Sequence, residues 1–317
     1  MRSPPPDPAL VTYLAPRIGA DRLAARLARE AEWERRVLGT PRRLLYVERW
    51  YSLQGWMRGL LRLAGLHARG RRNARRIALR HHRVALTGLP GVFAGYRILH
   101  LSDLHLDLAP DLPAAIARAV RGVDCDCCVL TGDFRALTFG PWQASVEGLA
   151  QVLEALAAPV YAVLGNHDSL CMVPAMEAMG VRVLLNESTC LERGGEKLVL
   201  AGVDDPHFHR AHDIDTALRE VPPGAVRILL AHSPECWLEA ARAGVDLYLC
   251  GHTHGGQICL PGGIPILRQA ACPRALTRGP WRWGRMQGYT SPGTGSSVID
   301  VRLNCPPEVT LHELRPA

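Results

Sequence analysis

Two histidines one residue apart follow an apolar run in the segment Gly251-His252-Thr253-His254-Gly255-Gly256-Gln257. The run, residues 245–250, predicts a short buried strand that ends at Gly251. Side chains at positions i and i+2 of an extended segment point to the same side, so we expect His252 and His254 to face one point. The surrounding glycines allow sharp turns and close approach to a ligand. Two imidazoles directed at one point indicate a metal site.

Apolar runs alternate with helical patterns from about residue 84 onward. Strands are predicted at residues 96–101, 127–130, 160–164, 227–231 and 245–250, and helices near 112–121, 143–157, 173–179 and 235–243. This alternation is typical of α/β architecture with buried strands. Shorter β segments are predicted near residues 181–185, 190–192, 197–202, 256–259, 288–291, 296–301 and 308–314. So many short strands indicate a second sheet packed on the first.

Each of the five longer predicted strands ends in polar residues that can bind a metal. These residues are Asp103, His105, Asp133, Asn166, His232, His252 and His254. In open α/β sheets, functional groups gather beyond the carboxyl ends of the strands. Taken singly, each residue has a structural explanation as a loop, a helix cap or a hydrogen-bonded core histidine such as His232. Their joint occurrence at one edge favours a metal centre.

The types of side chain in this set indicate which ion is bound. Aspartate, asparagine and histidine without cysteine favour Mn²⁺ first, or Fe²⁺ or Zn²⁺, over Ca²⁺ and Mg²⁺. Seven side chains are too many for one ion and suit two divalent metal ions that share a bridging carboxylate. Two ions roughly 3.5–4 Å apart form a clamp for in-line attack on phosphorus and acidify a shared water. The residues therefore predict a two-metal phosphoesterase.

The order of these motifs resembles the calcineurin-like metallophosphoesterase superfamily. The motifs are Asp103-x-His105, Gly132-Asp133, Gly165-Asn166-His167-Asp168, His232 and Gly251-His252-x-His254. The resemblance implies a four-layer α/β/β/α sandwich of two mixed sheets. It implies one ion held by Asp103, His105, Asp133 and His254, and another held by Asp133, Asn166, His232 and His252. It also implies attack by a metal-bridging hydroxide, while His167, oriented by Asp168, stabilises the transition state or protonates the leaving oxygen.

The longer string at residues 251–258 and the C-terminal residues 293–297 and 306–308 resemble a bacterial branch of YkuE-like and YaeI-like phosphoesterases. Some relatives in that branch are UDP-2,3-diacylglucosamine pyrophosphohydrolases of lipid A synthesis, which implies a lipid-linked substrate. Members often begin with a membrane anchor, whereas this chain has a basic amphipathic segment. A soluble phosphodiesterase or a phosphoprotein phosphatase is the competing enzyme hypothesis. A binding scaffold without catalysis is another, although the retention of every ligand and of His167 argues against it.

Two further features lie beside the predicted ligands. Arg135 follows Asp133 by two residues, and it is predicted either to clamp a substrate phosphate or to pair with an acid such as Asp168 or Asp204. Residues 204–209 follow a predicted strand, and they either border the substrate site or form a solvated turn.

Basic charge is concentrated in the N-terminal third of the chain. Residues 1–100 hold 20 Arg and 6 acidic residues, whereas residues 101–317 hold 17 basic and 24 acidic residues. Helices are predicted from Asp21, as N-cap, to about residue 38 and over residues 44–64, and the Pro-rich residues 1–9 are predicted to lack regular structure. We divide the chain into a basic helical N-terminal extension, residues 1–90, and a metallophosphoesterase domain, residues 91–317.

The Arg-rich residues 44–83 have two interpretations. They either pack on the main domain with a solvated charged face, or lie on an anionic membrane surface, which the adjoining Trp50, Tyr51 and Trp56 slightly favour. Nucleic acid is a less favoured partner because no nucleic-acid motif accompanies the arginines. The sequence contains no apolar run long enough for a transmembrane helix and no apparent export signal. We therefore expect reduced cysteines and a cytoplasmic location, either free or peripheral on the inner membrane.

Overall fold

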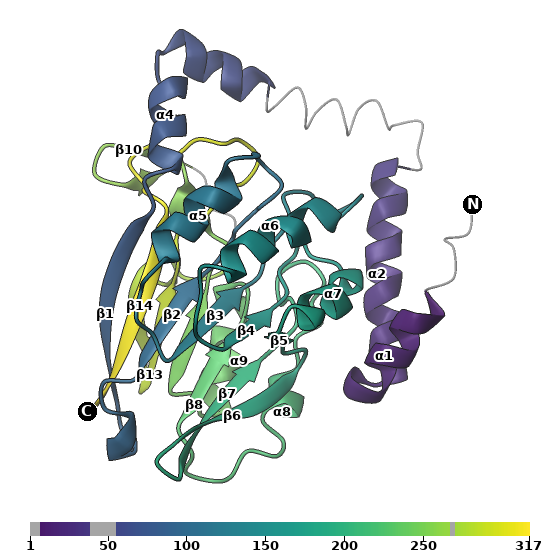
Figure 1. The fold of residues 1–317 in the computed structure, drawn as a ribbon, viewed down its shortest axis with the longest axis vertical. Helices are drawn as coiled ribbons and strands as arrows, with labels where there is room; N and C mark the ends of the chain where they lie inside the picture. The colour runs from purple at the N-terminus through teal and green to yellow at the C-terminus, as the bar shows by residue number, and fades with distance from the viewer. Residues whose placement is uncertain (1–6, 39–54, 267–269) are drawn as a thin grey trace.

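Two six-stranded sheets lie face to face, and helices cover their outer faces (Figure 1). The computed structural model describes residues 7–38, 55–266 and 270–317. The first sheet has the strand order β1-β14-β2-β3-β4-β5, and the second has the order β12-β13-β9-β8-β7-β6. This arrangement confirms the expected four-layer α/β/β/α sandwich.

Both sheets are mixed. The first contains β1 (Ala78–Leu86), β2 (Arg97–Leu101), β3 (Cys127–Thr131), β4 (Val160–Val163), β5 (Val181–Val183) and β14 (Glu308–Pro316), and β14 runs antiparallel to β2. The second contains β6 (Glu187–Arg193), β7 (Glu196–Gly202), β8 (Arg227–Leu230), β9 (Leu247–Cys250), β12 (Gly279–Trp283) and β13 (Met286–Thr290). Its two outer pairs, β12–β13 and β6–β7, are antiparallel. A separate hairpin is formed by β10 (Cys259–Leu260) and β11 (Ile264–Pro265).

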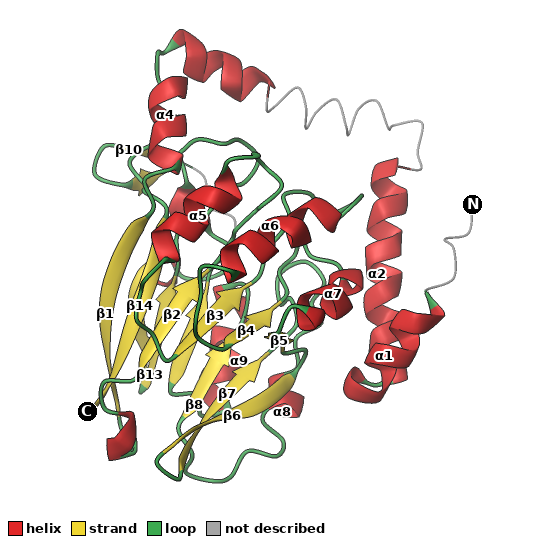
Figure 2. Ribbon diagram, viewed as in Figure 1, coloured by secondary structure: helices red, strands yellow, loops and turns green. Residues whose placement is uncertain are grey.

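Helices α5, α6 and α7 cover the outer face of the first sheet (Figure 2). The helices are α1 (Pro8–Ile18), α2 (Ala20–Leu38), α4 (His67–Ala74), α5 (Leu112–Val120), α6 (Gln143–Leu153), α7 (Val173–Ala178), α8 (Ile214–Ala217) and α9 (Trp237–Arg242). Residues 55–63 are also helical. Short 3₁₀ turns occur at Gly91–Phe93, Leu170–Met172, Pro234–Cys236, His254–Gly256 and Arg274–Leu276. None of the described helices is long and apolar enough to span a membrane.

The apolar runs are continuous because most central strands are buried on both faces. In β8, Ile228 and Leu230 pack between the two sheets, while Leu229 packs under α8 and α9 on the outer side. In β2, Ile98 points between the sheets and Leu99 points toward the outer helices. Alternate side chains of one strand thus fill two different apolar layers, which is why these strands are uniformly apolar rather than alternating.

The N-terminal helices α1 and α2 pack on the main domain. Leu10, Leu14 and Leu23 join the apolar layer outside the first sheet. The structure corrects two expectations here. Residues 8 and 9 already belong to α1, which begins after the capping residue Asp7, and Asp21 lies in the first turn of α2 rather than at its N-cap. Of the helix predicted over residues 44–64, residues 55–63 are helical, and residues 44–54 lie outside the described part of the chain.

Two β predictions differ from the structure. Strand β1 pairs with β14 along its whole length, so the first sheet begins within the predicted extension of residues 1–90. Its central residues are mostly polar and exposed, so a search for apolar runs does not detect this strand. Residues 296–301 form no strand, because Val298 has a left-handed φ of 63° and the side chain of Gln257 bonds the carbonyls of Ser297 and Ile299. The division at residue 90 itself stays a prediction.

Candidate metal centre

The seven predicted ligands all follow the carboxyl ends of central strands, and the two facing sheets bring these ends to one edge. Asp103 and His105 follow β2, Asp133 follows β3 and Asn166 follows β4. His232 follows β8, and His252 and His254 follow β9. All seven side chains are buried. The structure therefore gathers residues that lie up to about 150 positions apart in the sequence into one buried site.

Five of these residues have left-handed backbone conformations, which corrects the reasoning used for the two histidines after β9. The φ angles are 54° at Asp103, 43° at His105, 57° at Asp133, 70° at His252 and 50° at His254. Such values are costly for residues with a β-carbon and persist only where the surroundings enforce them. His252 and His254 are thus directed by tight turns rather than by an extended segment, and they enter different side-chain groups.

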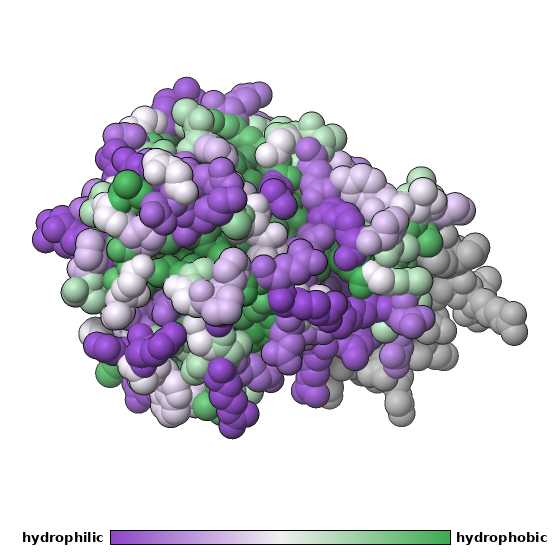
Figure 3. All heavy atoms as spheres, turned by 90° about the horizontal axis from the view of Figure 1, so that it is seen from below, coloured by the Kyte–Doolittle hydropathy of each residue, from purple (hydrophilic) through white to green (hydrophobic). Residues whose placement is uncertain are grey.

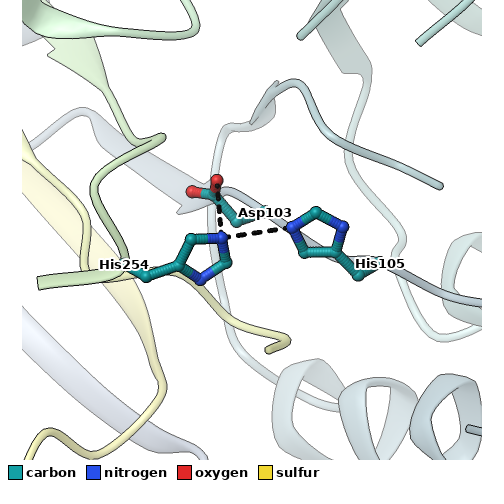
Figure 4. A group of neighbouring side chains, drawn as sticks. All are labelled: Asp103, His105 and His254. Atoms are coloured by element: carbon teal, nitrogen blue, oxygen red, sulfur yellow. Dashed lines mark hydrogen bonds and ion pairs between the residues drawn. The ribbon is translucent and has the colours of Figure 1, made fainter. Parts of the chain in front are cut away.

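The first group consists of Asp103, His105 and His254 (Figure 4). The Nε2 atoms of His105 and His254 are 3.1 Å apart, and His254 Nε2 is 3.4 Å from Asp103 Oδ1. His105 Nδ1 lies 2.8 Å from the carbonyl of Arg135. Because a carbonyl only accepts, His105 carries its hydrogen on Nδ1, and its Nε2 lone pair faces the group.

The second group consists of Asp133, His232 and His252. His232 Nε2 lies 3.3 Å from Asp133 Oδ2 and 3.2 Å from His252 Nδ1. Asn166 Oδ1 is 2.9 Å from the same His232 nitrogen. His232 Nδ1 donates to the carbonyl of Thr131 at 2.8 Å, so its Nε2 also faces the group and would offer its lone pair where an ion replaces the proton there.

Charge in the second group shows that its chemistry suits a cation. Burial lowers the pKa of His232, but the adjacent Asp133 carboxylate raises it more, to about 10. Burial raises the pKa of Asp133, yet His232 and His167 lower it well below its usual range. Positive charge is therefore favoured where the carboxylate meets the ring nitrogens, and a divalent ion supplies such charge. Nitrogen and oxygen donors of this kind fit Mn²⁺, Fe²⁺ or Zn²⁺.

Two glycines allow the strand ends to approach this closely. A β-carbon at Gly251 would lie 1.8 Å from Ser102 Oγ and 2.3 Å from Asp103 Oδ2. A β-carbon at Gly165 would lie 2.3 Å from Asp133 Oδ1. Any larger residue at either position would displace a carboxylate of the site.

Comparison with known proteins agrees with this geometry. The family described as calcineurin-like phosphoesterase matches residues 96–256, which include β2 to β9 and all seven predicted ligands. This chain belongs to the calcineurin-like phosphoesterases. It is therefore a metal-dependent phosphoesterase, and candidate metal-binding groups are present at the strand ends.

Three relatives show how far the similarity of this phosphoesterase extends. It is 29% identical over 237 residues to Phosphodiesterase YaeI of Escherichia coli (strain K12), and the aligned region covers 70% of this chain and 83% of that protein. It is 30% identical over 247 residues to metallophosphoesterase YkuE of Bacillus subtilis (strain 168), covering 74% and 84%. It is 28% identical over 248 residues to "Transmembrane protein with metallophosphoesterase domain" of Danio rerio, covering 72% and 55%.

The side chains of His167 and Asp168 are arranged differently from the expectation. His167 Nε2 lies 3.9 Å from Asp133 Oδ2, and its Nδ1 has no partner among the described residues. The Asp168 carboxylate instead accepts hydrogen bonds from the main-chain amides of Asp133, Phe134 and Gly165. Asp168 therefore ties the ends of β3 and β4 together, and it acts on His167 only through the backbone.

Arg135 does not form the ion pair that one of its two predictions required. Its three guanidinium nitrogens donate to the main-chain carbonyls of His167, Gly140 and Thr138. It is buried and forms no ion pair with Asp168 or Asp204 among the described contacts. The side chain thus holds the loop after β3 against the backbone of His167, and its role as a phosphate clamp stays a prediction.

Sequence reasoning missed two supports of the site. Arg302 is fully buried, and its guanidinium donates to the carbonyls of Pro292, Gly295 and His254. An arginine between Val301 and Leu303 was a signal for a buried cation. His207 packs against His252 with ring centroids 4.0 Å apart and ring planes tilted by 43°, and it bonds Glu235 at 2.9 Å.

The loop of residues 204–209 is not a solvated turn. Asp204, Asp205 and His209 are buried, and the Asp205 carboxylate accepts from the amides of His207, Phe208 and His209. Through His207, whose ring packs against that of His252, the loop borders the second group, and its place beside a substrate stays a prediction.

Proposed function

We propose that this phosphoesterase hydrolyses a phosphodiester or pyrophosphate bond with two divalent ions held at the strand ends. Asp103, His105 and His254 would hold one ion, Asn166, His232 and His252 would hold the other, and Asp133 would be shared. The supporting observation is the position of Asp133 Oδ2, which is 3.3 Å from His232 Nε2 and 3.8 Å from His105 Nε2. Such ions, when bound, acidify a water and neutralise phosphate oxygens. We propose Mn²⁺ first, with Fe²⁺ or Zn²⁺ as alternatives.

His167 is proposed to stabilise the transition state at the leaving oxygen or to protonate it. Its Nδ1 has no hydrogen-bond partner among the described residues, and His167 is 9% exposed at the edge of the site. Burial lowers the pKa of His167, although the Asp133 carboxylate opposes this shift. The ring therefore meets the substrate as a neutral imidazole whose N–H can donate a hydrogen bond to the leaving oxygen, which favours stabilisation of the transition state over full proton transfer. Asp168 and Arg135 would hold its backbone.

Metal removal and replacement tests this proposal. Protein treated with a chelator should lose hydrolysis of bis(4-nitrophenyl) phosphate by at least about a thousandfold, because the ions supply several kcal/mol of transition-state stabilisation. Mn²⁺ should restore the rate more than Ca²⁺ or Mg²⁺ at equal concentration. An unchanged rate in the metal-free protein, with metal content checked by mass spectrometry, would contradict the mechanism.

We further propose a lipid-linked substrate, such as UDP-2,3-diacylglucosamine, that is reached from the inner membrane surface. An apolar cleft begins at His254, and its walls include Met57, Ile258, Ile266 and Val298. An acyl chain would fit such a cleft while the phosphate lies at the ions. The relative from Danio rerio is named as a transmembrane protein, which agrees with a membrane setting for this kind of domain.

The residues around this cleft support each of the two interpretations of residues 44–83 for a different part of that segment. Helix α4 packs on the domain, since Gly70 lies against Val301 and Asn73 bonds the carbonyl of Arg302. The preceding helical residues instead expose apolar side chains, with Trp56 72%, Leu60 61% and Leu63 88% exposed. Leu260, Ile264 and Ile266 of the β10–β11 region are exposed as well. On the face of the molecule that is seen from below, by contrast, polar and apolar side chains are interspersed (Figure 3).

Vesicle binding tests the membrane proposal. The double variant Leu60→Asp/Leu63→Asp should bind phosphatidylglycerol vesicles at least about a hundredfold more weakly than wild type, because each leucine that enters the bilayer interface contributes about 1.5–3 kcal/mol. Leu238→Asp, which alters an exposed leucine on α9, is the matched control and should bind as wild type does. Equal binding of all three proteins would favour a soluble phosphodiesterase or a phosphoprotein phosphatase.

A further inference from the structure

Helix α2 sends two charged side chains toward the turn that carries His167. Arg26 is only 2% exposed. Its guanidinium donates to Asp204 Oδ2 at 3.0 Å, to Glu30 Oε1 at 2.5 Å and to the carbonyl of Asp168 at 3.3 Å. A buried guanidinium is retained only where its donors are satisfied, and here one of them is satisfied by the residue next to His167.

Glu30 binds the next two residues of the same turn. Its Oε2 accepts from the hydroxyl of Ser169 at 2.7 Å, and its Oε1 accepts from the amide of Leu170 at 3.0 Å. Three consecutive residues after His167 are therefore bonded to one helix that lies outside the matched family region of residues 96–256.

The opposite side of the turn is fixed by the main domain. The Asp168 carboxylate bonds amides at the ends of β3 and β4, and the amide of His167 donates to Asp133 Oδ1 at 2.9 Å. In the described part of the chain, no residue forms a hydrogen bond with His167 Nδ1. Because the ring itself is not anchored there, its place depends on the backbone that α2 and the strand ends hold between them.

Helix α2 also contacts the loop on the other flank of the centre. Trp33 packs edge-on against Phe208 with ring centroids 4.8 Å apart, and Arg26 bonds Asp204. This loop carries His207, whose ring packs against that of His252. One helix thus touches both loops that border the second side-chain group.

We propose that Arg26 and Glu30 are positioning residues for His167, so that the N-terminal helix α2 is a working part of the active site. This inference rests on the proposed role of His167 at the leaving oxygen. A misplacement of about 1 Å can lower a rate about a hundredfold even when it arises away from the reacting atoms. Loss of the contacts from α2 should therefore reduce leaving-group assistance more than metal binding.

The test compares Arg26→Met and Glu30→Gln with the control Arg22→Met, all in the full chain. Arg22 lies one turn earlier on the same helix and bonds Asp213 and Thr216 at the surface. With Mn²⁺ bound, kcat for phenyl phosphodiesters, which have a poor leaving group, should fall about tenfold to a hundredfold in the two test variants. The fall should be several times smaller for 4-nitrophenyl diesters, and KM and the Mn²⁺ dissociation constant should change less than about threefold. Arg26→Lys should recover part of the loss.

A second readout does not depend on activity. In the metal-free protein, hydrogen exchange of residues 165–172 should become faster in Glu30→Gln and Arg26→Met, and not in Arg22→Met. If Arg26→Met shows no cooperative thermal unfolding, Glu30→Gln decides the outcome. An equal loss of kcat for both leaving groups, or unchanged hydrogen exchange of residues 165–172, would overturn the inference. The proposed function would still stand in that case, provided that the wild-type protein hydrolyses the diesters. A wild-type protein without Mn²⁺-dependent hydrolysis would instead refute the proposed function.

Discussion

The histidines of the metal centre differ from a second set of histidines that lies only a few strands away. His82, His312 and His100 lie on the adjacent strands β1, β14 and β2. His82 Nδ1 is 3.0 Å from His312 Nδ1, and His312 Nε2 is 3.4 Å from His100 Nδ1. The line ends at Thr131, whose hydroxyl is 2.9 Å from His100 Nε2. In the metal centre, by contrast, the rings converge on carboxylates.

Burial acts on both sets, and the neighbouring carboxylates decide the result. Burial lowers the pKa of His100 to about 3 and moves that of His312 well below its usual range. Burial also lowers the pKa of His232, but Asp133 reverses the shift and brings it to about 10. Histidines that line up with one another thus stay neutral, whereas histidines around Asp133 attract positive charge. The same residue type makes a structural line in one place and a cation site in the other.

Removing the Asp133 carboxylate should have the largest effect on activity, because the histidines of the metal centre then lose the charge that distinguishes them from the His82, His312 and His100 set. Asp133→Asn keeps the shape of the side chain but removes the charge next to both His232 and His105. We expect hydrolysis to fall by at least about a thousandfold, since both ions lose a ligand. Metal content measured by mass spectrometry should fall for both ions. Two retained equivalents of Mn²⁺ would exclude Asp133 as the bridge.

The two histidines after β9 should separate the two ions. His254 belongs to the group of Asp103, and His252 belongs to the group of Asp133. The variants His254→Ala and His252→Ala should each lose about one equivalent of metal. Each should reduce kcat about a hundredfold, because only one of the two ions loses a ligand. Binding competition with Zn²⁺, or the absorption spectrum of bound Co²⁺, should show that a different site remains in each variant. Identical spectra for the two variants would contradict the split.

A smaller effect is expected in the histidine line and concerns stability in acid. The unfolded pKa of His100 is 6.5 and its folded pKa is about 3, so the unfolded chain binds more protons between these values. Stability from this group is complete above pH 6.5 and falls as the pH drops toward 3, by about 1.4 kcal/mol per pH unit. His100→Gln should reduce this slope by about that amount in urea unfolding of the metal-free protein.

The activity of His100→Gln at pH 8 should stay within about twofold of wild type, because His100 touches no residue of the two metal-binding groups. An unchanged acid slope would show that His100 is not held neutral in the folded protein. A large loss of activity would show instead that the histidine line is coupled to the metal centre through Thr131, which contacts both His100 and His232.

Sequence reasoning succeeded where a pattern is local. The apolar runs at β2, β3, β4, β8 and β9 follow from burial on both faces, and the polar residues at their ends are visible in the sequence. It failed for β1, whose polar residues gain their strand conformation only by pairing with β14. It also did not foresee the contacts of Arg135, because a guanidinium that bonds main-chain carbonyls of its own loop and of His167 leaves no mark on sequence spacing.

The contacts of Arg26 and Glu30 were invisible for the same reason. They join residues that are more than a hundred positions apart, and neither residue type nor spacing on α2 distinguishes them from a solvated helix face. The left-handed turns at the ligands could not be derived either, since only the packed strand ends force side chains such as Asp103 and His254 into that conformation.

The position of β14 has a consequence for the order in which the chain is built. This strand, at residues 308–316, is inserted between β1 and β2, although β1 and β2 are neighbours in the sequence. During synthesis, β1 must therefore wait until more than two hundred further residues have been made before it finds its pairing partner. Such late, long-range pairing slows folding and leaves an open strand edge exposed meanwhile. A nascent chain of this phosphoesterase is thus expected to need protection along β1 until its last strand emerges from the ribosome.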